Sequence, residues 1–235
     1  MKLICLTYAG GNKYSYRNFR PHIHEKIEMV TLELPGRGAR ISESFEKNLN
    51  NLVDDLFHQI QEHLSEDYMI FGHSMGAILG DLLIHKLESN LKKLPQCFLV
   101  TGCRSPEKNM VKPKIHLLSK EAFQDEVIQL GGMPDEIIKN QEILDYLLGI
   151  LRVDITALET HEYKQKKKYN VPIIALRGSE ERITEEDIID WEKQTISTFK
   201  HYVLYGNHFF ILKHLDFISE IINKTLLKTL KLSLK

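Results

Sequence analysis

The sequence predicts a mostly parallel, doubly wound α/β sheet that is interrupted by one helical insertion. Short apolar runs bounded by glycine or proline recur along the chain, as is typical of buried strands. Segments with helical periodicity separate these runs, which is the pattern of βαβ units. The length of 235 residues suits one large folding unit, because a single core can grow to roughly 250 residues. We therefore expect a single domain over residues 1–235.

The predicted strands and helices alternate along most of the chain. The expected strands cover residues 2–9, 29–36, 68–74, 96–103, 171–178 and 201–206. The expected helices cover residues 48–64, a segment that starts at Met75, and residues 185–196 and 214–230. Because apolar strands joined by helices must bury both faces, helices should cover the sheet on both sides.

Residues 104–169 depart from this alternation. The segment has helical periodicity with a Gly-Gly-Met-Pro interruption, and it contains no strand candidate. It is too long for an ordinary connection between strands, so we expect a helical insertion within the single domain. Such an insertion should lie at the carboxyl ends of the strands, where open α/β sheets bind ligands.

Composition excludes several classes of function. The formal net charge is −1 at pH 7 and no long basic block occurs, so we expect no nucleic-acid partner. No segment reaches the ~18 apolar residues of a membrane span, and the N-terminal apolar run lacks a signal-peptide cleavage pattern. We therefore expect a cytoplasmic protein without membrane contact. The three cysteines are Cys5, Cys97 and Cys103. They lack the spacing of a metal site and should be buried and reduced. We expect neither a metal nor a cofactor.

The stretch "YMIFGHSMGAILGDLL" contains the strongest motif in the chain. Ser74 lies between Gly72 and Gly76, after a predicted strand and before a predicted helix. The spacing is that of the G-x-S-x-G nucleophile elbow, in which the glycines allow the strand and helix to approach closely. A serine that merely caps the helix is the alternative. The strand, turn and helix together favour Ser74 as a nucleophile.

A serine hydroxyl needs a base, and chain order selects His208. In this fold the order is serine, acid, histidine, and His208 in "YGNHFFI" follows the last predicted strand. We expect His201 to begin that strand and His214 to lie on the final helix. We expect His73, inside the elbow, to serve as a packing residue.

The acid that orients the base should lie on the loop after the strand at 171–178. That loop, "SEERITEED", offers several carboxylates, any of which could instead be an exposed residue favoured by a helix dipole. Position on the loop favours Glu181, followed by Glu180 and then Asp187.

Backbone N–H groups should stabilise the oxyanion. One donor is the residue after the nucleophile, Met75. The second should come from the early turn "TYAGGN", where Ala9 or Gly10 supplies the N–H.

Several motifs together resemble one family. The series "YAGG", "LPGRGAR", "FGHSMGA", "LGGMP", "LRVD", "PIIALRG" and "GNHFF" is similar to the type II thioesterases that accompany nonribosomal peptide and polyketide synthetases. The resemblance implies an α/β-hydrolase fold whose residues 104–169 form a helical lid over an acyl channel. It also implies hydrolysis of acyl groups from the phosphopantetheine arm of an acyl or peptidyl carrier protein, and we expect a monomer. Apolar lid positions that would cover the channel are Phe123, Val127, Ile128, Leu130, Ile143, Leu147, Leu148 and Leu151.

The family's functional residues can be carried onto this sequence with one departure. The nucleophile falls on Ser74, the base on His208, and the oxyanion donors on Met75 and Ala9. The family's usual Gly-x-x-Asp loop reads "GSEE" here, so Glu181 replaces an aspartate; triads of this fold accept either acid.

Three alternatives remain open at this point. Asp154 of "LRVD" is expected to be a lid residue and is the rival triad acid. The enzyme could instead be a medium-chain acyl-ACP thioesterase or a generic carboxylesterase, because the same triad serves all three. A non-catalytic binding module of the same fold is the alternative from another class.

Overall fold

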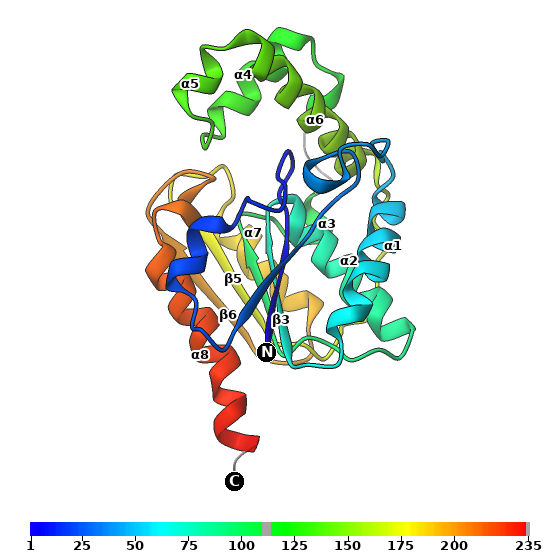
Figure 1. The fold of residues 1–235 in the computed structure, drawn as a ribbon, viewed down its shortest axis with the longest axis vertical. Helices are drawn as coiled ribbons and strands as arrows, with labels where there is room; N and C mark the ends of the chain where they lie inside the picture. Colours follow the sequence, from blue (N-terminus) through cyan, green and yellow to red (C-terminus); the bar gives the residue numbers. More distant parts are fainter. Residues whose placement is uncertain (110–113, 234–235) are drawn as a thin grey trace.

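Six parallel strands form one sheet in the computed structural model, which describes residues 1–109 and 114–233 (Figure 1). The spatial order is β2-β1-β3-β4-β5-β6, and every neighbouring pair is parallel. The predicted parallel α/β sheet is confirmed. The strands are β1 (Lys2–Leu6), β2 (Glu28–Leu32), β3 (Tyr68–His73), β4 (Phe98–Thr101), β5 (Ile173–Gly178) and β6 (Phe199–Leu204).

The central strands are apolar on both faces, which explains why they appear as continuous apolar runs. In β1, Ile4 and Leu6 belong to one buried cluster, whereas Leu3 and Cys5 belong to the other. Side chains alternate in the same way along β3 and β4, as the two-residue period of a strand requires. Both faces of the sheet therefore need covering helices.

Helices cover the two faces unequally. On one face α2 (Met75–Ser89) lies against the strands and α1 (Leu49–Ile60) packs on α2. Asn48 caps α1 by accepting from the N–H groups of the following turn, as an N-cap residue should. The other face is covered by α8 (Leu215–Ser233) and a 3₁₀ helix at Arg17–His22. The sandwiched position of α2 explains why most of its residues are buried.

The helix predicted at residues 185–196 is shorter than expected. An α-helix, α7, covers Glu185–Ile189, and a 3₁₀ segment then continues over Asp190–Gln194. The fully buried Trp191 lies in that segment, and its Nε1–H donates to the carbonyl of Cys103 at 2.8 Å. The packing of Trp191 therefore accompanies the change from α-helix to 3₁₀ helix at Asp190. Hydrophobic periodicity in the sequence does not reveal this change.

The stretch between β4 and β5 is largely helical as far as Thr160 in its described part, and residues 161–168 have no regular secondary structure. It contains α3 (Pro106–Asn109), α4 (Lys120–Gln129), α5 (Asp135–Ile138) and α6 (Gln141–Thr160). The predicted insertion at 104–169 also includes residues 110–113, which lie outside the described residues. Figure 1 places α4, α5 and α6 beyond the carboxyl ends of the strands. These helices form a small apolar core of their own around Phe123, Leu144 and Leu148.

Two expectations from composition can also be compared with the structure. The cysteines Cys5, Cys97 and Cys103 are buried, as predicted, and none of the three is in a disulfide. Among the described helices, none is both long enough and apolar enough to cross a membrane.

Candidate active site

Ser74 occupies the turn between β3 and α2. Its backbone has φ of 53° and ψ of −117°, a positive-φ conformation that non-glycine residues rarely adopt. Such strain is typical of functional sites, where the surrounding structure holds it in place. Here the Ser74 N–H donates to the carbonyl of Thr101 at 2.9 Å, and the Ser74 carbonyl accepts from Ala77 at 3.0 Å. The serine is thus held as the elbow motif predicts.

The two glycines of the motif are required by close contact. A Cβ on Gly72 would overlap the carbonyl oxygen of Gly76, and a Cβ on Gly76 would overlap the carbonyl oxygen of Leu6. The strand, the turn and the helix therefore approach one another at distances that only glycine permits.

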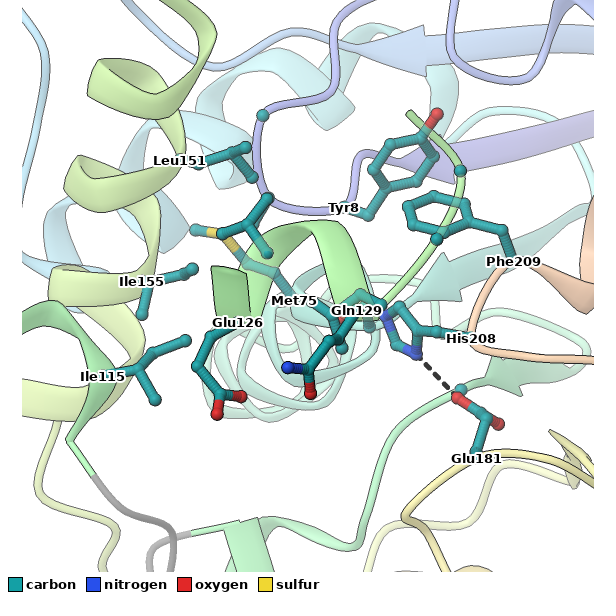
Figure 2. Close-up of a pocket in the computed structure, with 18 of the residues that line it drawn as sticks. Tyr8, Met75, Ile115, Glu126, Gln129, Leu151, Ile155, Glu181, His208 and Phe209 are labelled. Atoms are coloured by element: carbon teal, nitrogen blue, oxygen red, sulfur yellow. Dashed lines mark hydrogen bonds and ion pairs between the residues drawn. The ribbon is translucent and has the colours of Figure 1, made fainter. Parts of the chain in front are cut away.

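His208 and Glu181 meet in the structure. His208 lies between β6 and α8, and its Nδ1–H donates to Glu181 Oε1 at 2.6 Å (dashed line in Figure 2). Glu181 Oε2 accepts from the backbone N–H of Gly178 at 2.7 Å, so both carboxylate oxygens are held. This leaves Nε2 of His208 available to the Ser74 hydroxyl, and both side chains line the same cavity. The order of groups is the one a hydroxyl nucleophile requires.

The other carboxylates on this loop have different surroundings. Glu180 is exposed. Asp187 forms a capping box with Thr184 at the start of α7 and accepts from Arg104 Nε at 2.9 Å. These contacts lower the pKa of the Asp187 carboxyl, against the opposing effect of its burial. Of the three predicted candidates on the loop, only Glu181 is placed against His208.

The two other histidines near the last strand, His201 and His214, have partners other than Glu181. His201 lies within β6 rather than at its start, and its Nε2 is 3.1 Å from Glu185. His214 precedes α8 instead of lying on it, and its Nε2 donates to the Tyr205 carbonyl at 2.7 Å.

His73 is a packing residue, as predicted, and it packs against the candidate base. It is fully buried, and its ring centroid is 4.7 Å from that of His208. Burial and, to a lesser extent, the nearby His208 lower the pKa of His73 well below its ordinary value. A neutral ring at this point supports His208 without adding a competing charge.

The turn after β1 lies beside the serine. Ala9, Gly10, Ser74 and Met75 all line the cavity. The N–H of Gly10 donates to Asp154 Oδ2 at 2.7 Å, so this group is already engaged. Of the two residues predicted for the second oxyanion donor, Ala9 is therefore the one that fits, together with Met75 at the start of α2.

Asp154 forms a buried ion pair that the sequence analysis did not anticipate. Its carboxylate accepts two hydrogen bonds from Arg37, at 2.6 and 2.7 Å. The side chains of Arg37 and Asp154 are 3% and 0% exposed. Asp154 thus joins α6 to Arg37 and to the Gly10 turn, and none of these three bonds involves His208. The motif "LPGRGAR" contains both Arg37 and Arg40, and nothing local in it indicates which arginine is buried or which carboxylate it pairs with.

The cavity at Ser74 is large, and most of its lining comes from residues 104–169. Its volume is about 1240 Å³, above the roughly 300–1,000 Å³ of ordinary small-ligand pockets. Figure 2 shows Leu151, Ile155 and Ile115 on one side, facing Tyr8 and Phe209 on the other. An elongated apolar group could therefore extend from the serine between these two sets of side chains.

The predicted lining of the channel is correct only in part. The predicted lid positions that line the cavity are Val127, Leu130, Leu147 and Leu151. Phe123 and Leu148 instead pack in the small core of the helical segment, and Ile143 is exposed. Ile128 is half-buried and is not among the residues that line the cavity. Ile115 and Ile155 were not predicted, because helical periodicity does not distinguish the cavity side of a small helical unit from its interior.

The loop that carries Glu181 also contacts α4. Arg182 donates to Glu126 Oε2 at 2.9 Å and to Gln129 Oε1 at 2.5 Å, and both acceptors lie on α4. Within residues 1–109 and 114–233, no group of three or more His, Cys, Asp or Glu side chains could hold a metal ion.

The chain is similar to known thioesterases in sequence and in structure. The family model described as a thioesterase domain matches residues 1–226. The chain is 29% identical over 212 residues to the gramicidin S biosynthesis protein GrsT of Aneurinibacillus migulanus, covering 90% of this chain and 83% of that protein. It is 25% identical over 232 residues to the medium-chain S-acyl fatty acid synthase thioesterase of Rattus norvegicus, covering 96% of this chain and 88% of that protein. The solved structure of the type II thioesterase BorB from the borrelidin biosynthetic cluster is similar to this chain with a TM-score of 0.87 and 30% sequence identity. The match covers 96% of this chain and 92% of the BorB chain.

Proposed function

The chain belongs to the thioesterase family, and on that premise we propose that it hydrolyses acyl groups from the phosphopantetheine arm of carrier proteins through Ser74. Membership in the family makes it a hydrolase that acts on thioesters. The predicted resemblance to type II thioesterases of nonribosomal peptide and polyketide systems is confirmed by relatives such as GrsT and BorB.

One observation carries the catalytic assignment. The buried carboxylate of Glu181 holds Nδ1 of His208 at 2.6 Å, at a cavity that also contains Ser74 on its strained turn. A carboxylate in this position fixes the tautomer of the imidazole and stabilises the imidazolium that forms during the reaction.

Acylation follows from these positions. The Ser74 hydroxyl attacks the thioester carbonyl carbon while His208 Nε2 takes the hydroxyl proton. The developing oxyanion accepts from the N–H groups of Ala9 and Met75. When the carbon–sulfur bond breaks, His208 returns the proton to the departing thiolate, which leaves the acyl group on Ser74.

Deacylation repeats the same steps with water. His208 takes a proton from a water molecule, which attacks the acyl-serine ester. The carbon–oxygen bond to Ser74 breaks, and the proton returns to the serine oxygen. The products are a carboxylic acid and the free enzyme, while the carrier arm recovered its thiol in the first half of the reaction.

The biological role follows from this chemistry. Clearing acyl groups from stalled or wrongly primed carriers would regenerate a synthetase. The partner is accordingly an acyl or peptidyl carrier protein, and the enzyme would act in the cytoplasm as a monomer. Residues 104–169 would serve as the lid over the acyl channel.

A second candidate is a medium-chain acyl-ACP thioesterase of fatty acid synthesis. The similarity to the rat enzyme, 25% identity over 96% of this chain, favours this second candidate. The discriminating experiment is steady-state hydrolysis of one acyl group presented on peptidyl carrier proteins, on a fatty-acid acyl carrier protein and on coenzyme A. A higher kcat/KM on the synthetase carriers supports the proposal. Equal values on coenzyme A would favour a small-molecule hydrolase, and no turnover on any of the three would favour a binding module.

A further inference from the structure

A second, smaller cavity adjoins the channel at Ser74. Its volume is about 220 Å³. Ile78, Lys114, Leu158 and Glu159 line both cavities, so the two share a wall. The small cavity differs from the channel in having a buried carboxylate, Asp81, in its lining.

The carboxylate of Asp81 is incompletely satisfied. The residue is 0% exposed. Oδ1 accepts from the Tyr169 hydroxyl at 3.2 Å and is 3.8 Å from His85 Nε2. Oδ2 has no hydrogen-bond partner among the described residues. A buried carboxylate oxygen without a donor is costly, and the cavity gives a donor access to it.

Helix α2 connects this carboxylate to the nucleophile. Ser74, Ile78 and Asp81 are spaced at i, i+4 and i+7, so they lie along one face of the helix. With a rise of 1.5 Å per residue, Asp81 lies roughly 10 Å along the helix axis from Ser74. An acyl chain that leaves Ser74 past Ile78 would therefore reach Asp81 after two helical turns.

The described groups around Asp81 supply a positive charge but no hydrogen-bond donor to Oδ2. Burial raises the pKa of the Asp81 carboxyl to about 7, against smaller opposing effects of Lys166 and the Tyr169 hydroxyl. His85 does not supply the charge, because burial and Lys166 lower its pKa to about 4. Lys166 is a positive charge that acts on Asp81, but it does not hydrogen-bond Oδ2. A protonated amine inside the cavity would provide the donor that Oδ2 lacks.

We infer that the small cavity is a distal subsite of the acyl channel, in which Asp81 Oδ2 accepts a hydrogen bond from a protonated amine at the far end of the acyl group. The inference rests on the proposed thioesterase function and specifies its substrate class. Acyl groups that span about 10 Å and end in an amine are favoured over equally long groups that end in a methyl.

The test compares two thioesters of N-acetylcysteamine, octanoyl and ω-amino-octanoyl. In the wild type, kcat/KM for the amino substrate should exceed that for octanoyl by on the order of tenfold, the size of a hydrogen bond between charged groups. Asp81→Asn keeps the side-chain shape and should abolish the preference. Asp54→Asn, a surface change on α1 at a residue that pairs with Lys86, should keep it.

A second variant leaves Asp81 intact. Leu158 lines both cavities, so Leu158→Phe places a larger side chain between them. This variant should also remove the preference for the amino substrate. An equal kcat/KM for the two substrates in the wild type, or a preference that survives both Asp81→Asn and Leu158→Phe, would overturn the inference while leaving thioester hydrolysis intact. Failure to hydrolyse either thioester, or any carrier-bound acyl group, would instead overturn the proposed function together with the subsite.

Discussion

Replacing Asp154 with asparagine tests whether this residue anchors the lid or serves His208 as the triad acid. The carboxylate makes two hydrogen bonds to Arg37 and one to the Gly10 N–H, all between 2.6 and 2.7 Å. The substitution removes the negative charge and leaves the Arg37 guanidinium buried without a counter-ion.

The expected magnitude follows from burial. Breaking a fully buried ion pair by removing one partner costs about 3–5 kcal/mol of unfolding free energy. Asp154→Asn should therefore lower the unfolding free energy by about that amount. Arg37→Met should do the same, because it leaves a buried carboxylate. The double variant should cost only about 1–3 kcal/mol, since asparagine can still accept from Gly10 and no unpaired charge remains.

The assay is urea unfolding followed by fluorescence of Trp191, the single tryptophan of the chain, which is fully buried. Asp145→Asn is the matched control. Asp145 lies on the same helix and pairs with Lys120, but both side chains are substantially exposed, at 40% and 57%. Its replacement should cost under about 1 kcal/mol.

Activity measurements on the same variants complete the test. If Asp154 acts through the Gly10 turn, kcat should fall by at most about 10²–10³-fold, the value of one oxyanion donor. A loss near 10⁴-fold combined with an unchanged unfolding free energy would refute this reasoning and make Asp154 the acid.

The remaining predictions concern the candidate catalytic residues. Ser74→Ala should abolish turnover and labelling by a serine-directed phosphonate; label at another residue would refute the assignment. His208→Ala should lose about as much kcat as the serine variant, because residues that act as a unit are not additive, whereas His214→Ala should change kcat less than about twofold. Glu181→Gln should lower kcat by about 10⁴-fold, because His208 would adopt the wrong imidazole tautomer. Glu181→Asp should retain substantial activity. Glu180→Gln should have little effect on kcat, because the Glu180 side chain is exposed. Collapse of the Glu180 variant with full activity of Glu181→Gln would reassign the acid.

The sequence predicted most of the sheet because its physical signal is local. Strands buried on both faces must be apolar at every position, and the Ser74 elbow depends on two glycines within five consecutive residues. The contact between Glu181 and His208 was predictable only in outline, from chain order and from the ends of two adjacent strands. The Arg37–Asp154 pair was not predictable, because 117 positions separate its members and no periodic pattern links them.

Two contacts between the proposed lid and the rest of the chain differ in burial, and this difference determines how the lid should open. The tie between α6 and Arg37 is a fully buried ion pair with two hydrogen bonds, which solvent screens little. The tie between α4 and Arg182 is partly exposed, with side chains 68% and 33% accessible, and such pairs contribute under about 1 kcal/mol. The lid should therefore open by release of α4 while α6 stays fixed to the body of the enzyme. Amide hydrogen exchange at neutral pH should be faster in Lys120–Gln129 than in the α6 residues around Asp154, and Arg182→Ala should accelerate it only in α4. Equal exchange in the two helices, or acceleration in α6, would contradict this hinge.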